Sequence, residues 1–242
     1  MKKVLLLAGT AEARTLAGRL VDLPGVEPIA SLAGVTEAPG ALTVPTHTGG
    51  FGGADGLVDW IRANRVEAVV DATHPYATQM QTNAVAACRK TATPHLRLLR
   101  PPWPERPGWV NVPDMETAVD ACPRGARVLL TTGHKGLGAF AGRRDLQTAV
   151  RTIEPVKDLP ENLHPIHARP PYHTDSERAL FALLGITHLV TKNAGGAGTA
   201  KLDVADEMGI TTIVLDRPAP PPGEIAKTVD QAVAWLHRVV AF

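Results

Sequence analysis

The N-terminal stretch MKKVLLLAGTAEAR (residues 1–14) indicates the fold class, because a short apolar run, Val4 to Ala8, leads directly into a turn of small residues. From Glu12 to Val21, apolar residues then recur at helical spacing. A short buried strand that feeds a helix is the repeating unit of a parallel α/β fold. The charged start resembles a signal peptide, but the apolar run is too short for one and Glu12 follows it closely, so we expect a cytoplasmic protein.

The same alternation of strand and helix signals continues along the whole chain. Short apolar runs predict further strands at residues 26–31, 67–71, 95–99, 127–132, 148–153, 164–168, 188–192 and 212–215. Helical spacing predicts helices at residues 57–63, 79–90, 114–121, 176–184, 201–208 and 228–240. Continuous apolar strands need both faces of their sheet covered, so we predict an α/β architecture with mainly parallel sheets.

A proline-rich segment divides this pattern in two. Residues 100–108 (RPPWPERPG) contain four prolines in nine positions, which can continue neither a helix nor a central strand. We therefore predict two α/β domains, residues 1–100 and residues 101–242, joined at this linker. A second segment, APPPG at residues 219–223, sets the last predicted helix off from the body of the protein.

Composition and charge exclude several classes of protein. Apolar residues make up 44% of the 242 residues and charged residues 20%, so the chain is neither disordered nor fibrous. The 25 basic residues balance 24 acidic ones, and we expect no nucleic-acid partner. No apolar run approaches the roughly 18 residues of a membrane span, and we expect no membrane partner. The two cysteines, Cys88 and Cys122, lack CxxC spacing and are expected to be buried thiols.

Four loops that follow predicted strands are unusually rich in Gly, Thr, Asn or His. Ligands of open parallel sheets bind outside the carboxyl ends of the strands, where such loops lead into helices. Each of these loops follows a predicted strand, and this regularity is a stronger sign of ligand binding than any single motif. They are AGTAEAR (8–14), DATHPYA (71–77), TTGHKG (131–136) and KNAGGAG (192–198).

The first loop departs from the dinucleotide-binding fingerprint, since only Gly9 of the three expected glycines is present. Its small residues still permit a close backbone approach, and Thr10 can donate to a phosphate. A nucleotide site and a plain tight turn both fit these residues. Ser31, at the end of the second strand, carries no charge that would repel a 2′-phosphate, so NADPH is favoured if a nicotinamide nucleotide binds.

The DATHPYA loop places a carboxylate, an imidazole and an aromatic ring beside the first loop, where a flat cofactor ring can pack. The alternative is a well-capped junction, with Thr73 or His74 capping the next helix and Pro75 in its first turn.

In KNAGGAG, backbone N–H groups exposed by glycine can cradle a carboxylate or phosphate, although a surface turn is the alternative. The loop lacks the GK[ST] order of ATP-hydrolysing proteins. Lys201, nine residues after Lys192, faces the same cavity or solvent, and we include it among the substrate-binding candidates.

The sequence gives little support for a metal site or for a catalytic nucleophile. His164, His167 and His173 lie among prolines that break any helix able to align them, and we predict no metal site. No GxSxG elbow is present.

Taken together, five segments resemble the precorrin-6A reductases of cobalamin biosynthesis, a family that includes cobalt-precorrin-6A reductases. The resemblance implies two Rossmann-like domains, with NADPH and a corrin precursor in the cleft between them. It also implies reduction of one ring double bond of precorrin-6A to give precorrin-6B. The segments are LLLAGTAEARTLA (5–17), GGFGG (49–53), DATHPYA (71–77), TKNAGGAGTAKL (191–202) and LDRP (215–218).

The resemblance also implies roles for individual residues. The cofactor phosphates would lie at Gly9, Thr10 and Glu12, its adenosine ribose at Ser31, Ala33 and Gly34, and its nicotinamide at Thr73, His74, Pro75 and Tyr76. The substrate would face Thr132, Gly133, Lys135, Lys192, Asn193, Gly195 and Gly196. Many relatives carry Arg where this chain has Val35, so NADH stays open as the cofactor.

Within this scheme His74 and Lys192 are the candidate catalytic residues. An imidazole can carry a proton near neutral pH, so His74 is either the proton donor or a positioning residue. Water or a substrate carboxyl group can also give the proton. The sequence leaves open the oligomeric state, the presence of cobalt in the substrate, and a handover to neighbouring pathway enzymes.

Two other functions remain open: a reductase or epimerase of a small nucleotide-linked substrate, and a dinucleotide-binding regulator without chemistry.

The near-neutral charge hides a basic segment. Residues 88–151 contain 11 basic and 5 acidic residues. This excess is either a solvated basic face or a field that attracts the polyanionic ligands implied above.

Overall fold

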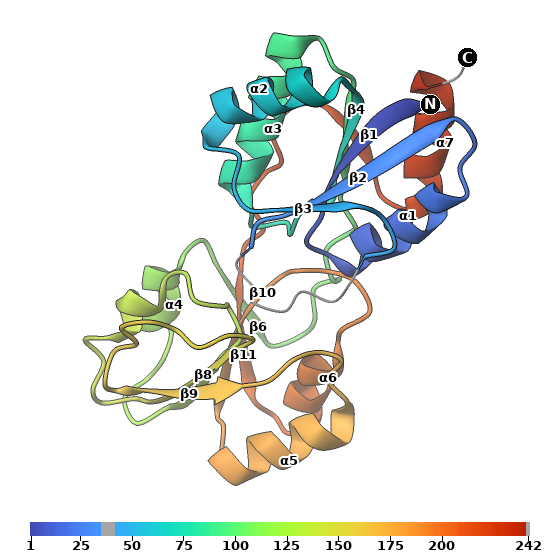
Figure 1. Ribbon diagram of the computed structural model, residues 1–242. Coiled ribbons are helices and arrows are strands. Elements are labelled where there is room, and N and C mark those ends of the chain that lie inside the picture. The colour runs from blue at the N-terminus through green and yellow to red at the C-terminus, as the bar shows by residue number, and fades with distance from the viewer. Residues whose placement is uncertain (35–41, 241–242) are drawn as a thin grey trace. The chain divides into compact units, whose positions relative to one another are not determined.

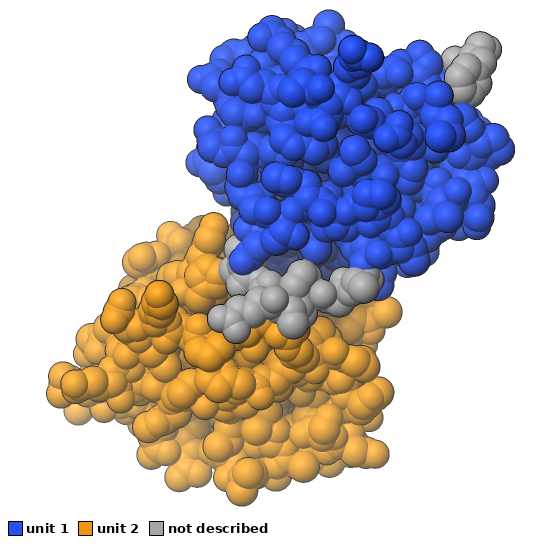
Figure 2. Space-filling view, viewed as in Figure 1, with its two compact units in different colours: residues 1–101, 218–242 blue, residues 102–217 orange. Residues whose placement is uncertain are grey.

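The chain forms two compact units in the computed structural model, which describes residues 1–34 and 42–240. Unit 1 comprises residues 1–101 and 218–242, and unit 2 comprises residues 102–217 (Figures 1 and 2). Each unit has its own six-stranded sheet. Within the described part of the chain, no helix is both long and apolar enough to cross a membrane.

Unit 1 is a parallel sheet covered by helices on both faces. Along the central strand β1, Val4 and Leu6 pack into one apolar cluster with α1 and α7, whereas Leu5 and Leu7 pack into a second cluster with α2 and α3. The sheet order is β12 (Glu224–Ala226), β5 (His95–Leu98), β4 (Val66–Asp71), β1 (Lys2–Leu7), β2 (Val26–Leu32) and β3 (Thr46–Thr48). The helices are α1 (Ala11–Val21), α2 (Gly53–Asn64), α3 (Thr78–Thr91) and α7 (Val229–Val239).

Unit 2 repeats this plan. Leu129 and Leu189, on neighbouring strands, pack with Phe181 and Leu202 of the helices α5 and α6. The sheet order is β6 (Trp109–Val112), β11 (Thr211–Leu215), β10 (His188–Lys192), β7 (Arg127–Leu130), β8 (Gln147–Thr152) and β9 (Leu163–His167). The helical segments are α4 (Met115–Asp120), the 3-10 helix η1 (Leu137–Phe140), α5 (Thr174–Leu184) and α6 (Ala200–Glu207).

The two sheets share one topology. In unit 1 the chain runs from β1 outward through β2 to β3, and then resumes on the other side of β1 with β4 and β5. In unit 2 it runs from β7 through β8 to β9, and resumes with β10 and β11. The strand order therefore reverses between β1 and β4 and between β7 and β10. In open parallel sheets a ligand binds at such a switch point, outside the carboxyl ends of the strands.

The predicted α/β class with mainly parallel sheets is confirmed, since every strand pairing found in the described residues is parallel. The short strands β3, β6 and β12 were not predicted. The two cysteines are buried free thiols, as expected, and burial raises the pKa of Cys88 to about 12 and that of Cys122 to about 11.

The predicted domain boundary needs one correction. Residues 218–242 belong to unit 1, although the linker at residues 100–108 had suggested that everything after it forms the second domain. The reason is packing: β12 pairs with β5, and α7 buries Trp235 and Leu236 in the core beside α1. The segment at residues 219–223 is thus part of a second connection between the units, rather than a spacer before a peripheral helix.

Truncation of Leu236 tests this assignment. Its side chain is 0% exposed, so Leu236→Ala should lower the free energy of unfolding by about 2–5 kcal/mol through lost apolar contacts and a residual cavity. Peptides from unit 1 should show faster amide hydrogen exchange, and peptides from unit 2 should not. Val21→Ala, at a position 53% exposed on α1, is the matched control and should change little. Faster exchange confined to residues 102–217 would contradict the assignment.

Candidate functional site

The switch point of unit 1 joins two of the loops predicted from the sequence. Loop 8–10 follows β1 and loop 72–77 follows β4. The Thr10 hydroxyl donates to the carbonyl oxygen of Ala72 at 2.9 Å, which ties the loops together. A Cβ on Gly9 would lie 3.6 Å from the backbone nitrogen of His74 and from Cα of Thr73, so the glycine lies directly against the second loop.

The first turn of α1 forms one wall of this site. Thr10 caps the helix, and its side chain accepts from the Ala13 backbone N–H at 3.2 Å. The Glu12 carboxylate forms an ion pair with the Arg100 guanidinium, and both side chains are largely buried. A small hollow opens here, lined by Thr10, Glu12, Thr73, Pro75, Leu98, Leu99 and Arg100.

Arg100 was not predicted from the sequence as a site residue, because the prolines that follow it indicated only a linker. The signal that could have found it is its place two residues after β5, at the same carboxyl edge as the other loops.

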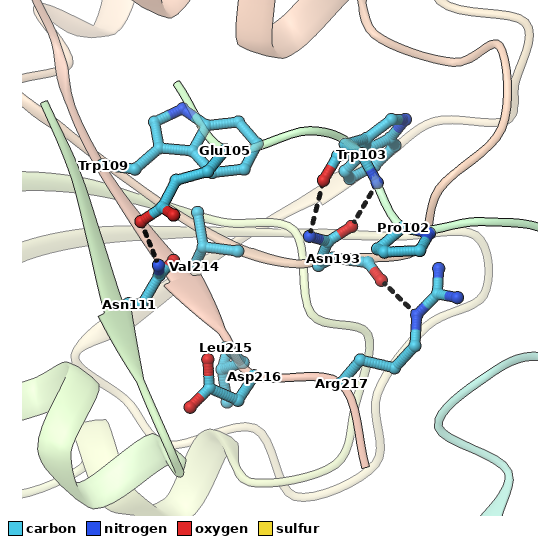
Figure 3. A pocket seen from close by; sticks show the side chains of 10 residues that line it. All are labelled: Pro102, Trp103, Glu105, Trp109, Asn111, Asn193, Val214, Leu215, Asp216 and Arg217. Carbon is cyan, nitrogen blue, oxygen red and sulfur yellow. Dashed lines mark hydrogen bonds between the residues drawn. The ribbon is translucent and has the colours of Figure 1, made fainter. Parts of the chain in front are cut away.

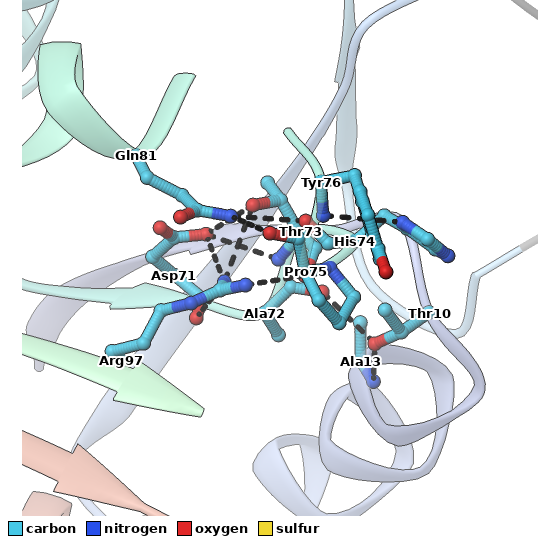
Figure 4. Close-up of polar contacts among 10 residues, drawn as sticks. All are labelled: Thr10, Ala13, Asp71, Ala72, Thr73, His74, Pro75, Tyr76, Gln81 and Arg97. Atoms are coloured by element: carbon cyan, nitrogen blue, oxygen red, sulfur yellow. Dashed lines mark hydrogen bonds and ion pairs between the residues drawn. The ribbon is translucent and has the colours of Figure 1, made fainter. Parts of the chain in front are cut away.

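A buried ion pair fixes the start of the DATHPYA loop (Figure 4). Asp71 Oδ1 accepts from Arg97 Nη1 at 2.7 Å, from the Thr73 hydroxyl at 2.7 Å and from the Thr73 backbone N–H at 3.0 Å. Arg97 Nη2 also donates to the Thr73 carbonyl oxygen at 2.9 Å. The side chains of Arg97 and Asp71 are 4% and 0% exposed. Asp71 therefore has a structural role, and it sets the backbone that carries the following residues.

The middle of the same loop, at His74 and Pro75, is held by Gln81 of α3. Its Nε2 donates to the carbonyl oxygens of His74 at 3.0 Å and Pro75 at 3.1 Å (Figure 4). Nδ1 of His74 accepts from the Tyr76 backbone N–H at 3.3 Å, and the two rings lie 5.7 Å apart between centroids. The structure thus brings His74, Pro75 and Tyr76 together in one fixed turn.

The alternative interpretation of this loop, in which Thr73 or His74 caps the next helix, is wrong. Helix α3 begins at Thr78, with Ala77 as its N-cap and without a side-chain cap. The Thr73 hydroxyl is already bound to Asp71, and residues 74–77 form a turn of their own in which Ala77 donates to the His74 carbonyl oxygen at 2.8 Å. Neither Thr73 nor His74 therefore caps α3.

The residues predicted near the adenosine ribose differ in exposure. Ser31 is buried at the end of β2, and its carbonyl oxygen accepts from the Ala8 backbone N–H at 2.9 Å. Ala33 and Gly34 are exposed, and Gly34 has a φ of +71°, which favours glycine. Val35, on which the choice between NADPH and NADH depended, lies outside the described residues.

The switch point of unit 2 gathers lysines. Lys192, the last residue of β10, donates from Nζ to the Thr132 carbonyl oxygen, and Lys201 donates to the Thr131 hydroxyl at 3.0 Å. Burial lowers the pKa of Lys192, and the nearby charge of Lys135 lowers it further. The predicted residues of loops 131–136 and 192–198 thus meet at one edge of the sheet.

Asn193 and Gly196 have an additional, structural role that the sequence did not reveal. The Asn193 side chain accepts from the Trp103 backbone N–H at 2.8 Å and donates to the Trp103 carbonyl oxygen at 3.2 Å (Figure 3). Trp103 Nε1 donates to the Gly196 carbonyl oxygen at 2.7 Å. Beside these contacts lies a pocket of about 160 Å³, lined by Pro102, Trp103, Glu105, Trp109, Asn111, Asn193, Val214, Leu215, Asp216 and Arg217.

The basic excess of residues 88–151 is largely compensated. Four of its arginines pair with carboxylates elsewhere in the sequence: Arg97 with Asp71, Arg100 with Glu12, Arg106 with Asp203 and Asp206, and Arg151 with Glu177. These pairs reduce the part of the basic excess that can attract anions at a distance. The lysines at the switch point of unit 2 are the better candidates for contact with anions.

Comparison with known proteins identifies the family. The family model "Precorrin-6x reductase CbiJ/CobK" matches residues 3–237. The chain belongs to this family. Precorrin-6x reductases are oxidoreductases of cobalamin biosynthesis that act on a CH–CH group, and the resemblance inferred from the sequence is confirmed.

Several members of the precorrin-6x reductase family resemble the chain over its full length. Precorrin-6A reductases of Rhodococcus erythropolis and Rhodobacter capsulatus are each 42% identical to it, over 98% of this chain and 98% and 96% of their own. The cobalt-precorrin-6A reductase of Priestia megaterium is 29% identical. The solved structure of "CobK precorrin-6A reductase" superposes with a TM-score of 0.92 at 41% identity, and covers 99% of this chain and 97% of that one.

Arg97→Met tests the buried ion pair under the DATHPYA loop. Removing the guanidinium leaves Asp71 buried without its partner charge, so the free energy of unfolding should fall by about 3–5 kcal/mol. Urea unfolding of the full chain, followed by far-ultraviolet circular dichroism, measures the loss. Lys90→Met is the matched control, since Lys90 and Asp55 form an exposed pair worth about 0–1 kcal/mol. Equal effects of the two substitutions would contradict the structural role of Arg97.

Proposed function

We propose that this reductase uses NADPH to reduce one ring double bond of precorrin-6A, giving precorrin-6B. The observation that carries the proposal is the 42% identity, over 98% of the chain, to proteins named precorrin-6A reductase. Proteins named cobalt-precorrin-6A reductase are only 28–29% identical, which favours the cobalt-free substrate. A catalytic oxidoreductase is thereby favoured over the regulator considered from the sequence.

Unit 1 supplies the proposed cofactor site. Its switch point offers the N-terminus of α1, the Thr10 hydroxyl and the Arg100 guanidinium to a phosphate, and Gly9 lets the two loops approach closely. Glu12 would then hold Arg100 in place through their ion pair. We assign the ribose to Ser31, Ala33 and Gly34, and the nicotinamide to Thr73, His74, Pro75 and Tyr76. These residues fit a pyridine nucleotide, which when bound supplies the hydride of the reduction.

His74 acts in this scheme as a positioning residue. Its Nδ1 accepts from the Tyr76 backbone N–H at 3.3 Å, which orients the imidazole ring within the turn. A ring held in this way can orient a flat group beside it. Gln81 and the Asp71–Arg97 pair hold the backbone on both sides of His74 and so fix the direction of the ring.

Unit 2 supplies the proposed substrate site. A corrin precursor carries several carboxylates, and Lys135, Lys192 and Lys201 offer cations to them at the switch point. Thr132, Gly133, Gly195 and Gly196 would supply polar backbone groups, and Asn193 would fix the loop through Trp103. Lys192, which is half-buried at the end of β10, is one residue of this group that we assign to catalysis.

Oxidation of NADPH on addition of precorrin-6A tests the proposed function. The absorbance of the reduced cofactor should fall in proportion to the substrate consumed, and mass spectrometry should show a product heavier by two hydrogens. Samples without substrate, and samples with NADH or with the cobalt-containing substrate, are the controls. Tight binding of NADPH without oxidation would favour the regulator. Turnover of small nucleotide-linked substrates in place of precorrin-6A would favour the alternative reductase or epimerase.

The two proposed sites predict opposite effects for one substitution in each unit. Arg100→Met should weaken NADPH binding about tenfold, because a phosphate contact is lost, and should leave kcat at saturating NADPH nearly unchanged. Lys192→Ala should lower kcat about tenfold or more and leave the Kd for NADPH unchanged. Fluorescence titration with NADPH and steady-state kinetics measure the two quantities. Arg19→Met, which removes an exposed pair with Asp230, is the control for Arg100. The reverse pattern would move Lys192 to the cofactor site.

A further inference from the structure

Reduction of a carbon–carbon double bond needs a proton as well as a hydride. The hydride joins one carbon, and a group of the enzyme, the solvent or the substrate must give a proton to its neighbour. His74 is held as part of a fixed turn, and its Nδ1 already accepts a hydrogen bond from the Tyr76 backbone N–H. The switch point of unit 2 contains a lysine, Lys201, whose surroundings suit proton donation better.

Lys201 lies near the start of α6, directly after the glycine-rich loop 192–198. Its ammonium group donates to the Thr131 hydroxyl at 3.0 Å and lies 5.6 Å from the centre of the Trp103 ring. Thr131 directly follows β7, and Trp103 is itself held by the loop after β10. The Lys201 ammonium group is therefore fixed between the two loops of the switch point, by a hydroxyl and an aromatic ring.

The charges around Lys201 are unusual for a lysine. Arg151 of β8 and Glu177 of α5 form an ion pair whose side chains are 4% and 2% exposed, and the Arg151 guanidinium lies 4.0 Å from the centre of the Tyr172 ring. Lys192 approaches from β10, with Lys135 next to it. Lys201 thus shares its surroundings with several cations and one carboxylate, which is already paired.

These surroundings favour the neutral amine of Lys201. Burial is the largest cause, Arg151 and Lys192 add to it, and Glu177 opposes it; together they lower the pKa of Lys201 to about 7. An ammonium group with a pKa in this range can both hold and release a proton at physiological pH. An ordinary exposed lysine, with a pKa of about 10.4, releases its proton far less readily.

We propose that Lys201 is the catalytic residue that donates the proton in the reduction; this proposal rests on the proposed function. One carbon of the double bond receives the hydride, with its electron pair. The electrons of the π bond form the second C–H bond, between the neighbouring carbon and a proton that leaves Nζ of Lys201. The lysine is left as a neutral amine and regains a proton from water. The product has gained two hydrogens, and the enzyme has returned to its starting state.

Two substitutions separate proton donation from simple binding of an anion. Lys201→Met keeps the apolar stem but removes the proton, and should lower kcat at least 100-fold. Lys201→Arg keeps the positive charge, but a guanidinium does not release its proton below pH 12. It should therefore remain at least 100-fold slow in kcat while the KM for substrate stays within a few-fold of the unchanged enzyme. Lys157→Met, at an exposed lysine of unit 2, is the control and should keep full activity.

The pH dependence gives a second signature. A general acid must be protonated, so kcat of the unchanged enzyme should be constant at low pH and fall as the pH rises through about 7, the pKa of Lys201. This fall should be absent from the residual activity of Lys201→Met. His74→Gln should keep it, because His74 positions a ring and gives no proton.

A measurement without turnover completes the test. Lysines labelled by reductive methylation with ¹³C-formaldehyde can be titrated by NMR in the full-length protein. One resonance should titrate near pH 7 in the unchanged protein and be missing from Lys201→Met.

The outcomes distinguish the two proposals. Failure of the unchanged enzyme to oxidise NADPH with precorrin-6A would overturn the proposed function. If that activity is present, the role of Lys201 is overturned by any of three results: recovery of kcat in Lys201→Arg, loss of the alkaline fall in His74→Gln but not in Lys201→Met, or the absence of a lysine resonance that titrates near pH 7.

Discussion

The buried pair of Asp71 and Arg97 is the constraint on which the geometry of the first switch point depends. Two charges removed from water are tolerated only when they are paired and hydrogen-bonded, so both side chains have little freedom to move. Their bonds run to the hydroxyl, the N–H and the carbonyl of Thr73, and therefore fix the backbone at the point where β4 ends. The direction of His74 and the contact of this loop with Gly9 follow from that fixed backbone.

The second unit reaches the same arrangement by different means. There Lys192 and Lys201 hold the loop after β7. The Lys192 ammonium group donates to the backbone carbonyl of Thr132, and the Lys201 ammonium group donates to the hydroxyl of Thr131. The parallel topology brings the loops together in both units, because the strand order reverses at the same relative position. The residue types then decide the chemistry: a buried ion pair gives a rigid wall, whereas lysines held by a backbone carbonyl and a hydroxyl give a site for anions and protons.

The sequence was most informative where the signal is local. The alternation of apolar runs and helical spacing predicted both sheets, and the composition of four loops located both switch points, since strand, loop and helix are adjacent in the chain. Pairings between distant residues carried no such signal. Trp103 and Asn193 are 90 positions apart, and Glu12 and Arg100 are 88 apart. The strand β12 has three residues, too few for any periodicity, and its partner β5 lies more than a hundred residues earlier.

The net charge of a segment also fails to reveal pairings between distant residues. The basic excess of residues 88–151 suggested a field for anions, but Arg97 and Arg151 are buried against carboxylates from other parts of the sequence. A charge that is paired in the core stabilises the fold and attracts nothing at a distance, because its field is cancelled at close range. A few lysines at the switch point of unit 2 therefore matter more for anion binding than the net charge of residues 88–151. Lys201 differs from Arg97 in that its ammonium group contacts a hydroxyl and an aromatic ring, and such contacts leave its proton available for chemistry.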